Sequence, residues 1–344
     1  MNHHSHHSRA LPTPRSRAAG FSLIELMISL LLGLLVVGAA IGIFLSNRQT
    51  FTAAQNLGSI QENARTAFEL MARDLREAGG NPCVNDVPVV NVVNGSAGNW
   101  YTNLRDWSTT VEGFGGGDAT TGLAFGTGAA ERVNGTDAIQ ILSAGSQVST
   151  INAHDTAGNQ FTVTGPHQFA AGDLVVACNG RQASMFQATN VAGQVITNGT
   201  GGVTPGNCTS GLALQPVGVC NAAAGAFQYE APNSVLTKLN AIRWYVGNNA
   251  RGGTSLYQSH LRGGATAAVQ NDEIIDGVTN MAVTYLLRGA ADYGAASTVG
   301  AANWGNVIAM RIDLTLVSED NVGTDGNPLQ RHLIQVASLR NRNP

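Results

Sequence analysis

A carboxylate at the edge of a long apolar stretch is the most unusual chemical feature of this sequence. The twenty residues from Leu26 to Leu45 carry no charge, and Glu25 stands directly before them. At about 1.5 Å per residue, a helix of that length spans a hydrocarbon core roughly 30 Å thick. An ionisable group at this place costs at least about 2–3 kcal/mol unless it finds a partner. Glu25 is therefore the first candidate for a functional residue.

Other residues that could support chemistry form weaker patterns. The glycine-rich stretch Gly113–Asp118 is not followed by the Gly-Lys-Ser/Thr of a phosphate-binding loop. Residues 318–327 are rich in oxygen atoms and could hold calcium, but they lack the spacing of an EF-hand loop. A solvated hairpin connection is the simpler interpretation. The histidines of the body, scattered without ligand or catalytic spacing, are His154, His167, His260 and His332. We therefore predict no metal site, no cofactor and no enzymatic activity.

Four cysteines are candidates for disulfide bonds: Cys83, Cys178, Cys208 and Cys220. No two of them form a Cys-x-x-Cys pair, which argues against zinc binding and thioredoxin-like redox chemistry. An even number of cysteines in a translocated protein predicts two disulfides, with three possible connectivities. Pairing Cys208 with Cys220 closes the shortest loop and would leave Cys83 to pair with Cys178.

The composition is typical of a secreted, loop-rich β protein. Only 12% of the 344 residues are charged, and 42 are glycine; cytosolic enzymes usually approach about 25% charged residues. Residues 1–20 hold three arginines and no acid, so the remainder has 22 acids against 16 bases, a formal charge of −6. A mildly acidic body with a single lysine, Lys238, gives no basic surface for nucleic acid.

The residues around the apolar stretch predict how it sits in a membrane. Arg9, Arg15 and Arg17 precede it and only Arg48 follows closely, which places the N-terminus in the cytoplasm. A secretory signal is shorter and is followed by a small-x-small cleavage site, and none follows here. Any cleavage therefore precedes the apolar stretch, which remains as an anchor. The histidine tract at residues 3–7 belongs to an unstructured leader.

Helical periodicity continues beyond the apolar stretch. Apolar residues recur at intervals of three and four from Leu57 to Ala78, as on one face of an amphipathic helix. Gly79-Gly80-Asn81-Pro82 ends the pattern, and no proline lies between Phe21 and Ala78. We predict a single helix, with a transmembrane half at residues 21–45 and an amphipathic half at 46–79.

The remaining sequence predicts β structure. Residues 80–235 contain short strand-like segments between turn signals, which indicates irregular β structure with long loops. Alternation of apolar and polar residues then predicts strands near 242–246, 281–287, 308–316 and 332–339. The expected fold is α+β, with the amphipathic helix packed on an antiparallel sheet of a globular β-rich domain at 80–344.

Residues 20–27, Gly-Phe-Ser-Leu-Ile-Glu-Leu-Met, resemble the class III signal of type IV pilins and pseudopilins. The resemblance implies that a prepilin peptidase cuts after Gly20, removes residues 1–20 and methylates the new terminal amine of Phe21. It also implies that Glu25 acts in subunit assembly. Phe21 and Glu25 are four residues apart and share a helix face. A carboxylate in lipid that pairs with the terminal amine of a neighbouring subunit avoids the cost of burial alone. The alternative is a glutamate that merely reaches the headgroups.

Four further segments resemble PilW-type minor pilins, namely residues 64–80, 276–281, 310–314 and 339–342. The resemblance implies a type IV pilin fold and a minor pilin that initiates pilus assembly in a priming or tip complex, supporting adhesion and twitching motility. The implied partners are other minor pilins, the major pilin, prepilin peptidase, the inner-membrane assembly machinery and a PilY-type adhesin. The implied location is the bacterial inner membrane, with a single span, a periplasmic body and later incorporation into the pilus.

Two other functions remain open from the sequence. A J-type minor pseudopilin of type II secretion has a similar signal and architecture, and neighbouring genes would distinguish the two. A DNA- or ligand-binding pilin would carry its receptor site in the loops of residues 81–235. The acidic charge and the missing basic patch argue against DNA.

Overall fold

The computed structural model describes residues 20–83, 87–95, 98–215, 224–323 and 325–342. The chain divides into two compact units, Met1–Ala54 and Gln55–Pro344. In the first unit, every described residue from Gly20 to Phe51 is exposed, including the apolar side chains from Leu23 to Leu45, and only Thr52 and Ala53 are half-buried. The second unit contains all of the buried core, so it has its own hydrophobic interior.

The long helix α1 (Leu23–Glu77) has 55 residues, close to the single helix predicted from the periodicity. It ends because Gly79 adopts a left-handed conformation with φ +68°, which glycine reaches without steric cost. A Cβ atom at this position would also lie 2.9 Å from Oγ1 of Thr110. The chain therefore leaves the helix at the glycine pair that the sequence indicated.

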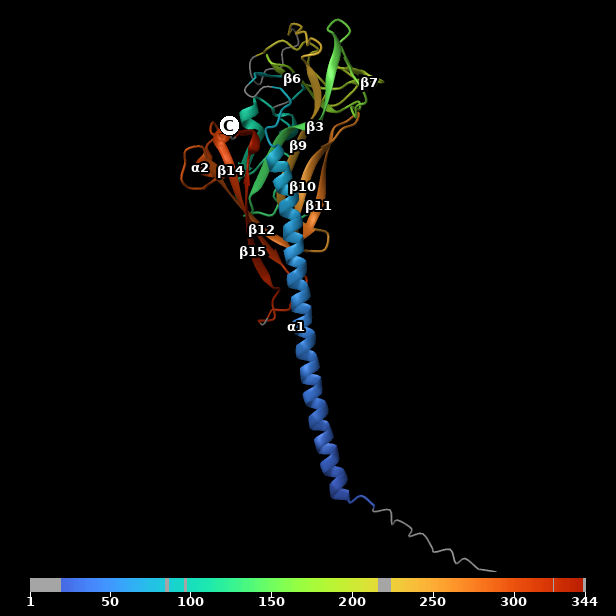
Figure 1. Cartoon of the computed structure of the whole chain (residues 1–344), viewed down its shortest axis with the longest axis vertical. Helices are drawn as coiled ribbons and strands as arrows, with labels where there is room; N and C mark the ends of the chain where they lie inside the picture. Colours follow the sequence, from blue (N-terminus) through green and yellow to red (C-terminus); the bar gives the residue numbers. More distant parts are fainter. Residues whose placement is uncertain (1–19, 84–86, 96–97, 216–223, 324, 343–344) are drawn as a thin grey trace, which may run out of the picture. The chain divides into compact units, whose positions relative to one another are not determined.

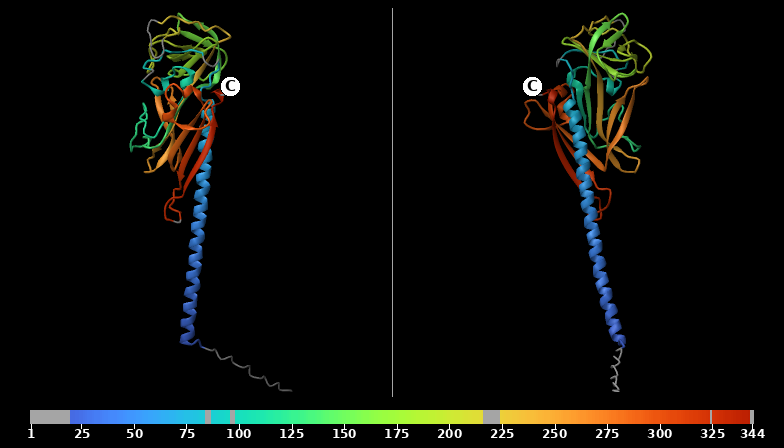
Figure 2. Two further views of the ribbon diagram at one scale, coloured as in Figure 1. Left: turned by 90° about the vertical axis from the view of Figure 1, so that its left-hand side faces the viewer. Right: turned by 45° about the vertical axis from the view of Figure 1, so that its right-hand side comes forward.

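The second unit contains two sheets, which are seen from different sides in Figures 1 and 2. The larger has eleven strands, with the order β1-β6-β5-β9-β3-β4-β8-β7; β10 continues from β9 to β11, and β2 pairs with β3. The smaller has the order β13-β12-β14-β15. The strands are β1 (Val89–Asn91), β2 (Val111–Phe114), β3 (Ala138–Asp155), β4 (Gln160–Val163), β5 (Leu174–Cys178), β6 (Ala183–Gln187), β7 (Asn190–Ala192), β8 (Val195–Thr197), β9 (Val235–Asn248), β10 (Thr254–Arg262), β11 (Ala268–Asp276), β12 (Val278–Leu287), β13 (Gly294–Ala295), β14 (Val307–Val317) and β15 (Gln330–Ser338). The short helices are η1 (Trp100–Thr102), η2 (Trp107–Thr110), α2 (Ala296–Val299), η3 (Trp304–Asn306) and η4 (Arg340–Arg342).

The α+β class, with a long N-terminal helix followed by sheets, is confirmed and is consistent with a pilin fold. The sheets differ from the prediction in two respects. The larger sheet is mixed, because β1 pairs with β6 in parallel. The predicted strand near 242–246 lies in β9 of this sheet, whereas the other three predicted strands form β12, β14 and β15 of the smaller one. Period-two alternation identifies a strand but does not determine which sheet it joins.

The apolar stripe of α1 packs into the largest core cluster. Its buried residues are Ile60, Ala64, Ala67, Phe68, Met71 and Leu75. This cluster takes further side chains from β9 and β10 of the larger sheet and from β12, β14 and β15 of the smaller one. In Figure 2 the C-terminal half of α1 accordingly runs between these two groups of strands. The helix therefore packs against both sheets in one shared core, whereas the sequence predicted that it packs on a single sheet.

A disulfide joins the loop after α1 to the larger sheet. Cys83 is bonded to Cys178 at the end of β5, with a Cα–Cα distance of 6.1 Å. Cys208 is also disulfide-bonded. Its predicted partner Cys220 lies outside the described residues, so the Cys208–Cys220 pairing stays a prediction.

We expect the mature protein to contain no free thiol, which mass spectrometry after alkylation without reductant would show. Replacing both Cys83 and Cys178 by serine should lower the free energy of unfolding, because the bond closes a loop of 95 residues. The chain-entropy account gives about 4–5 kcal/mol for a loop of this size. Four titratable cysteines, or a double variant as stable as the wild type, would contradict the assignment.

Candidate functional site

The N-terminal end of α1 brings together the residues that the sequence singled out. Ser22 caps the helix: its Oγ accepts a hydrogen bond from the backbone N–H of Glu25 at 3.2 Å, and its carbonyl accepts one from Leu26 at 3.1 Å. Ser22 and Glu25 have the spacing of a capping box, in which the glutamate occupies the third helical position. Phe21 and Glu25 are both exposed. The Ser-x-x-Glu pattern in the sequence is the signal that identifies Ser22 as the cap.

Gly20 has no packing reason to be glycine. A Cβ atom placed there would meet no atom within 4 Å, and the residue is exposed. The same open surroundings are found at Gly33 within the apolar half. Within the chain, neither position needs a small residue, so the type of residue 20 is explained by something other than this fold.

In the second unit, α1 is fixed to the larger sheet by a buried carboxylate. Asp74, 2% exposed, accepts hydrogen bonds from Nε1 of Trp244 at 3.0 Å and from Nε2 of Gln258 at 2.7 Å. Burial raises the pKa of Asp74, and the nearby Arg73 charge partly opposes this shift. The apolar periodicity from Leu57 to Ala78 by itself predicts that Asp74 lies on the polar face of the helix. Asp74 instead faces the strands because two donors there satisfy it.

The C-terminal segment holds the end of the same helix. Nδ2 of Asn341 lies 3.2–3.4 Å from the carbonyl oxygens of Arg76, Glu77 and Ala78, which have no partner further along the helix. Arg342, 8% exposed, donates to the carbonyl oxygen of Ser108 at 2.8 Å, to Oγ1 of Thr110 at 2.9 Å and to the carbonyl oxygen of Trp304.

Burial lowers the pKa of Arg342 to about 10, so it remains charged at neutral pH. A charged donor that reaches the two short helices η2 and η3 ties them together beside the helix end. The segment 339–342 thus closes the second unit around the end of α1.

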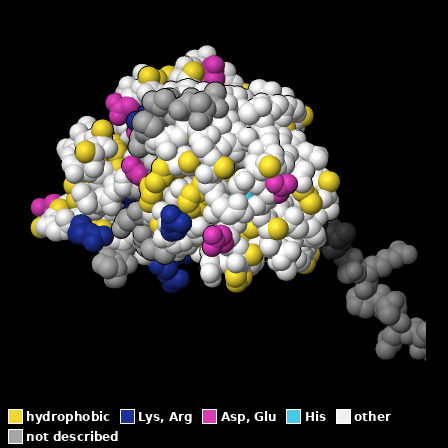
Figure 3. Space-filling model, turned by 90° about the horizontal axis from the view of Figure 1, so that it is seen from above, with side chains coloured by type: hydrophobic (Ala, Val, Ile, Leu, Met, Phe, Trp, Pro, Cys, Tyr) yellow, Lys and Arg dark blue, Asp and Glu magenta, His cyan; other side chains and the backbone are white. Residues whose placement is uncertain are grey.

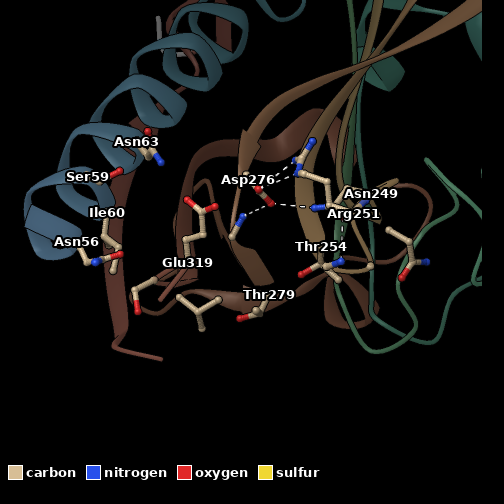
Figure 4. Close-up of a pocket in the computed structure, with 16 residues that line it drawn as sticks. Asn56, Ser59, Ile60, Asn63, Asn249, Arg251, Thr254, Asp276, Thr279 and Glu319 are labelled. Carbon is tan, nitrogen blue, oxygen red and sulfur yellow. Dashed lines mark hydrogen bonds and ion pairs between the residues drawn. The ribbon is translucent and has the colours of Figure 1, made fainter. Parts of the chain in front are cut away.

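A polar pocket of about 570 Å³ lies beside the first turns of α1 in the second unit (Figure 4). The helix contributes Asn56, Ser59, Ile60 and Asn63. The wall formed by the turns between β9 and β10 and between β11 and β12 contributes Arg251 and Asp276, which lie 3.0 Å apart as an ion pair. Among the described residues, no group of three histidine, cysteine or acidic side chains could hold a metal ion.

The calcium candidate at residues 318–327 joins β14 to β15, as a hairpin connection does. The hydroxyl of Ser318 donates to the carbonyl oxygen of Asp320 and accepts from the N–H of Leu329, both at 2.7 Å. Asp325 accepts from the N–H of Asn327 at 3.1 Å. These oxygens therefore form turns within the connection.

The glycine-rich stretch 113–118 is explained by packing. Gly113 lies in β2 against the ring of Tyr285, which leaves no space for a Cβ atom. Gly116 lies against the backbone of Gly135 in the same way. The glycines allow this close approach of chain segments.

Charged side chains are sparse on the face of the second unit that is seen from above (Figure 3). Figure 3 shows there only a few charged side chains, of both signs and scattered. The four histidines of the body have separate surroundings: His154 stacks on Phe161 at 3.9 Å, His260 lies 3.4 Å from Asp272, and His332 lies 3.7 Å from Asp313. His167 contacts the carbonyl oxygen of Gly193 at 2.7 Å.

Comparison with known families gives two matches. A family model described as type IV pilus-assembly protein W matches residues 243–340, and the prokaryotic N-terminal methylation motif matches residues 15–41. Both matches are consistent with a PilW-type minor pilin. No curated protein and no solved structure matches the chain. The first match runs from β9 to Arg340 and includes the whole smaller sheet, and the second includes Gly20, Phe21 and Glu25.

The two matches support a minor pilin in type IV pilus assembly, a structural role without catalysis. Among the described residues, one helix is long and apolar enough to cross a membrane, and together with the pilin motif it suggests a pilin anchored by one span. A pilin of this family interacts with other pilus components. For such a protein the candidate functional site is α1 itself: an exposed apolar half with Glu25, and a docked half held by Asp74 and the C-terminal segment.

Replacing Asp74 by alanine should lower the free energy of unfolding of the body (residues 46–344) by roughly 1–3 kcal/mol, because buried donors lose their acceptor. Chemical denaturation checks this. Glu62→Ala on the exposed side of the same helix is the control and should change little. An Asp74→Ala body as stable as the wild type would contradict the role of the carboxylate.

The raised pKa of Asp74 predicts the direction in which the stability of the body changes with pH. The stability that this group contributes is fully present below its ordinary pKa near 3.8 and is lost as the pH rises through the raised folded-state pKa. The stability of the wild type relative to Asp74→Asn should therefore fall between about pH 4 and neutral pH. A difference that stays constant or grows with pH would show that the folded-state pKa is not raised.

Proposed function

We propose that the protein is a minor pilin that helps to initiate type IV pilus assembly within a priming or tip complex, and thereby supports piliation, adhesion and twitching motility. The observation that carries the proposal is the apolar half of α1: a fully exposed apolar helix with one carboxylate at its start, inside the match to the methylation motif. Exposed apolar surface of this extent is unfavourable in water, so it fits lipid first and neighbouring helices later.

In this proposal, prepilin peptidase removes residues 1–20 on the cytoplasmic side of the inner membrane and methylates Phe21. The arginines before the apolar stretch support this orientation, with the body in the periplasm. Residues 21–45 anchor the protein until it enters the filament, and residues 46–79 carry the β-rich body. The proposed partners are other minor pilins, the major pilin, the inner-membrane assembly machinery and a PilY-type adhesin.

We consider two roles for Glu25, one at the start of its own helix and one in the contact with a neighbouring subunit. Its backbone N–H is used by the Ser22 cap, but its exposed carboxylate is available to another chain. A glutamate at the third position of a helix already stabilises the helix start through the dipole. The assembly role requires in addition a cationic partner, which the terminal amine of a neighbouring processed subunit supplies. Such a pair satisfies a carboxylate in lipid and fixes one axial register between subunits.

Substituting Gly20 by valine should leave the precursor uncleaved, because the peptidase must recognise the residue before the cut. Intact-mass spectrometry of the membrane fraction would show a protein that retains residues 1–20. Gly33→Ala is the matched control, since both glycines have open surroundings, and it should be processed normally. Normal processing of the Gly20 variant would overturn the cleavage site.

Glu25→Gln should be processed but should enter pili at least about tenfold less than the wild type, corresponding to roughly 1.4 kcal/mol. Glutamine keeps the capping-box geometry and removes the charge, so this change isolates the pairing role. Ser22→Ala removes the cap and keeps the carboxylate, and it should assemble better than Glu25→Gln. Immunoblots of sheared pili measure incorporation. Equal incorporation of Glu25→Gln and the wild type into pili would contradict the pairing role.

A further inference from the structure

The last strand of the smaller sheet has an open edge. β15 has nine residues and pairs on one side with β14, from Ala309↔Ser338 to Val317↔Gln330, without a register shift. Within the described residues, no strand pairs with its other side. An unpaired strand edge presents a row of backbone donors and acceptors to any extended chain that can reach it.

The register shows which residues of β15 direct their backbone groups outward. The N–H of Leu339 donates to the carbonyl oxygen of Ile308, and the N–H of Ser318 donates to that of Leu329. In an antiparallel ladder, such hydrogen-bonded pairs alternate with pairs whose backbone groups point away from each other. Every second residue from Leu329 to Leu339 therefore bonds to β14. The residues between them point their N–H and C=O groups to the open edge: Gln330, His332, Ile334, Val336 and Ser338.

The same residues carry exposed side chains on the outer face of the sheet. Ile334 is 51% exposed and Val336 is 52% exposed, among the few large apolar side chains so exposed in the second unit. The intervening Leu333 and Ala337 face the core instead. β15 thus combines free backbone groups with two neighbouring aliphatic side chains, the two elements that an added strand uses for affinity and specificity.

Other strand edges of the second unit are protected. β1, β2, β7 and β13 have only two to four residues. β11 has nine residues but carries Asp272, Glu273 and Asp276, and its pairing with β10 contains a register shift. Short strands, charges and irregular pairing are the usual means by which proteins block edge association. β15 has no acidic residue, no proline and no irregularity in its pairing.

The charges around this edge indicate the chemistry of the occupant. Arg311 lies opposite Val336 on the outer face, Arg331 lies within β15, and Arg340 follows it, all exposed. No ion pair involves these three arginines within the part of the chain that the structure describes. Asp313, opposite Ile334, is the nearby acid and lies 3.7 Å from His332. A strand that carries carboxylates would complement the three arginines.

We propose that the open edge of β15 is a docking site for an extended strand of another protein, with aliphatic side chains at alternate positions against Ile334 and Val336 and carboxylates against the flanking arginines. The added strand continues the smaller sheet by hydrogen bonds to the outward groups of His332, Ile334 and Val336. This site lies in the second unit, is separate from Glu25, and adds to the proposed function without depending on it.

The experiment measures fluorescence anisotropy of a labelled nine-residue peptide that alternates valine with threonine and carries aspartate at both ends. It uses the body at residues 46–344, which contains the whole core. Val336→Pro removes one outward N–H and leaves the bonds to β14 intact, as proline is tolerated at a strand edge. It should weaken binding at least about fivefold, since a hydrogen bond contributes roughly 1 kcal/mol. Val336→Ile keeps both the N–H and the aliphatic contact, and it should bind at least as tightly as the wild type.

Two peptide controls keep the test decisive even where Val336→Pro does not fold. A peptide methylated on its ladder-forming amides should not bind, and a peptide with lysine in place of aspartate should bind at least about tenfold more weakly at low salt. Equal binding of the methylated peptide would overturn strand addition, and equal or tighter binding of the lysine peptide would overturn the acidic partner. If the body dimerises through β15 and does not bind the peptide, the occupant of the edge is a second copy of this chain. This outcome would also overturn the proposal.

Discussion

The buried hydrogen bonds of Asp74 to Trp244 and Gln258 are the contact on which the second unit depends most. They fix the rotation of α1 about its own axis, because only one helix face can bring a carboxylate to those two donors. The apolar stripe from Ile60 to Leu75 alone would tolerate small rotations, since apolar contact is not directional. With the rotation fixed, the same stripe meets strands of both sheets. Asn341 and Arg342 then hold the helix end beside the short helix η2, which contains Thr110.

The sequence predicted most of α1 because its signals are local. The helical period of the apolar residues, the absence of proline and the glycine pair Gly79-Gly80 can all be recognised from residues that are close together in the sequence. The strands β12, β14 and β15 were predictable for the same reason, because alternation is local. The division into two sheets was not, since pairing of β9 with β3 joins residues far apart in the chain. Asp74 was assigned to the polar face because periodicity carries no information about a donor some 170 residues away.

The candidate site likewise has parts that the sequence predicted and parts that it did not. Gly20, Phe21 and Glu25 were found by type and spacing, and their surroundings in the fold add only that residue 20 is open and that Ser22 caps the helix. The role of the segment 339–342 could not be read from its residue types. Its Asn341 acts on carbonyl groups at the far end of a helix that precedes it by more than 260 residues. The open edge of β15 likewise follows from the pairing register, which the alternation of β15 does not determine.

Within the described residues, the apolar half of α1 and the edge of β15 are thus left without partners, and these two surfaces differ in kind. The apolar half of α1 is exposed along its whole circumference, so it can contact several neighbours at once and is specified mainly by the position of Glu25. The edge of β15 can accept one strand in a narrow set of registers, because a shift by one residue turns the side chains of the incoming strand to the other face. Packing of helices sets where a subunit sits along a filament, whereas pairing at a strand edge selects which protein sits beside it. A minor pilin that must occupy a defined place among similar helices needs the second kind of contact as well as the first.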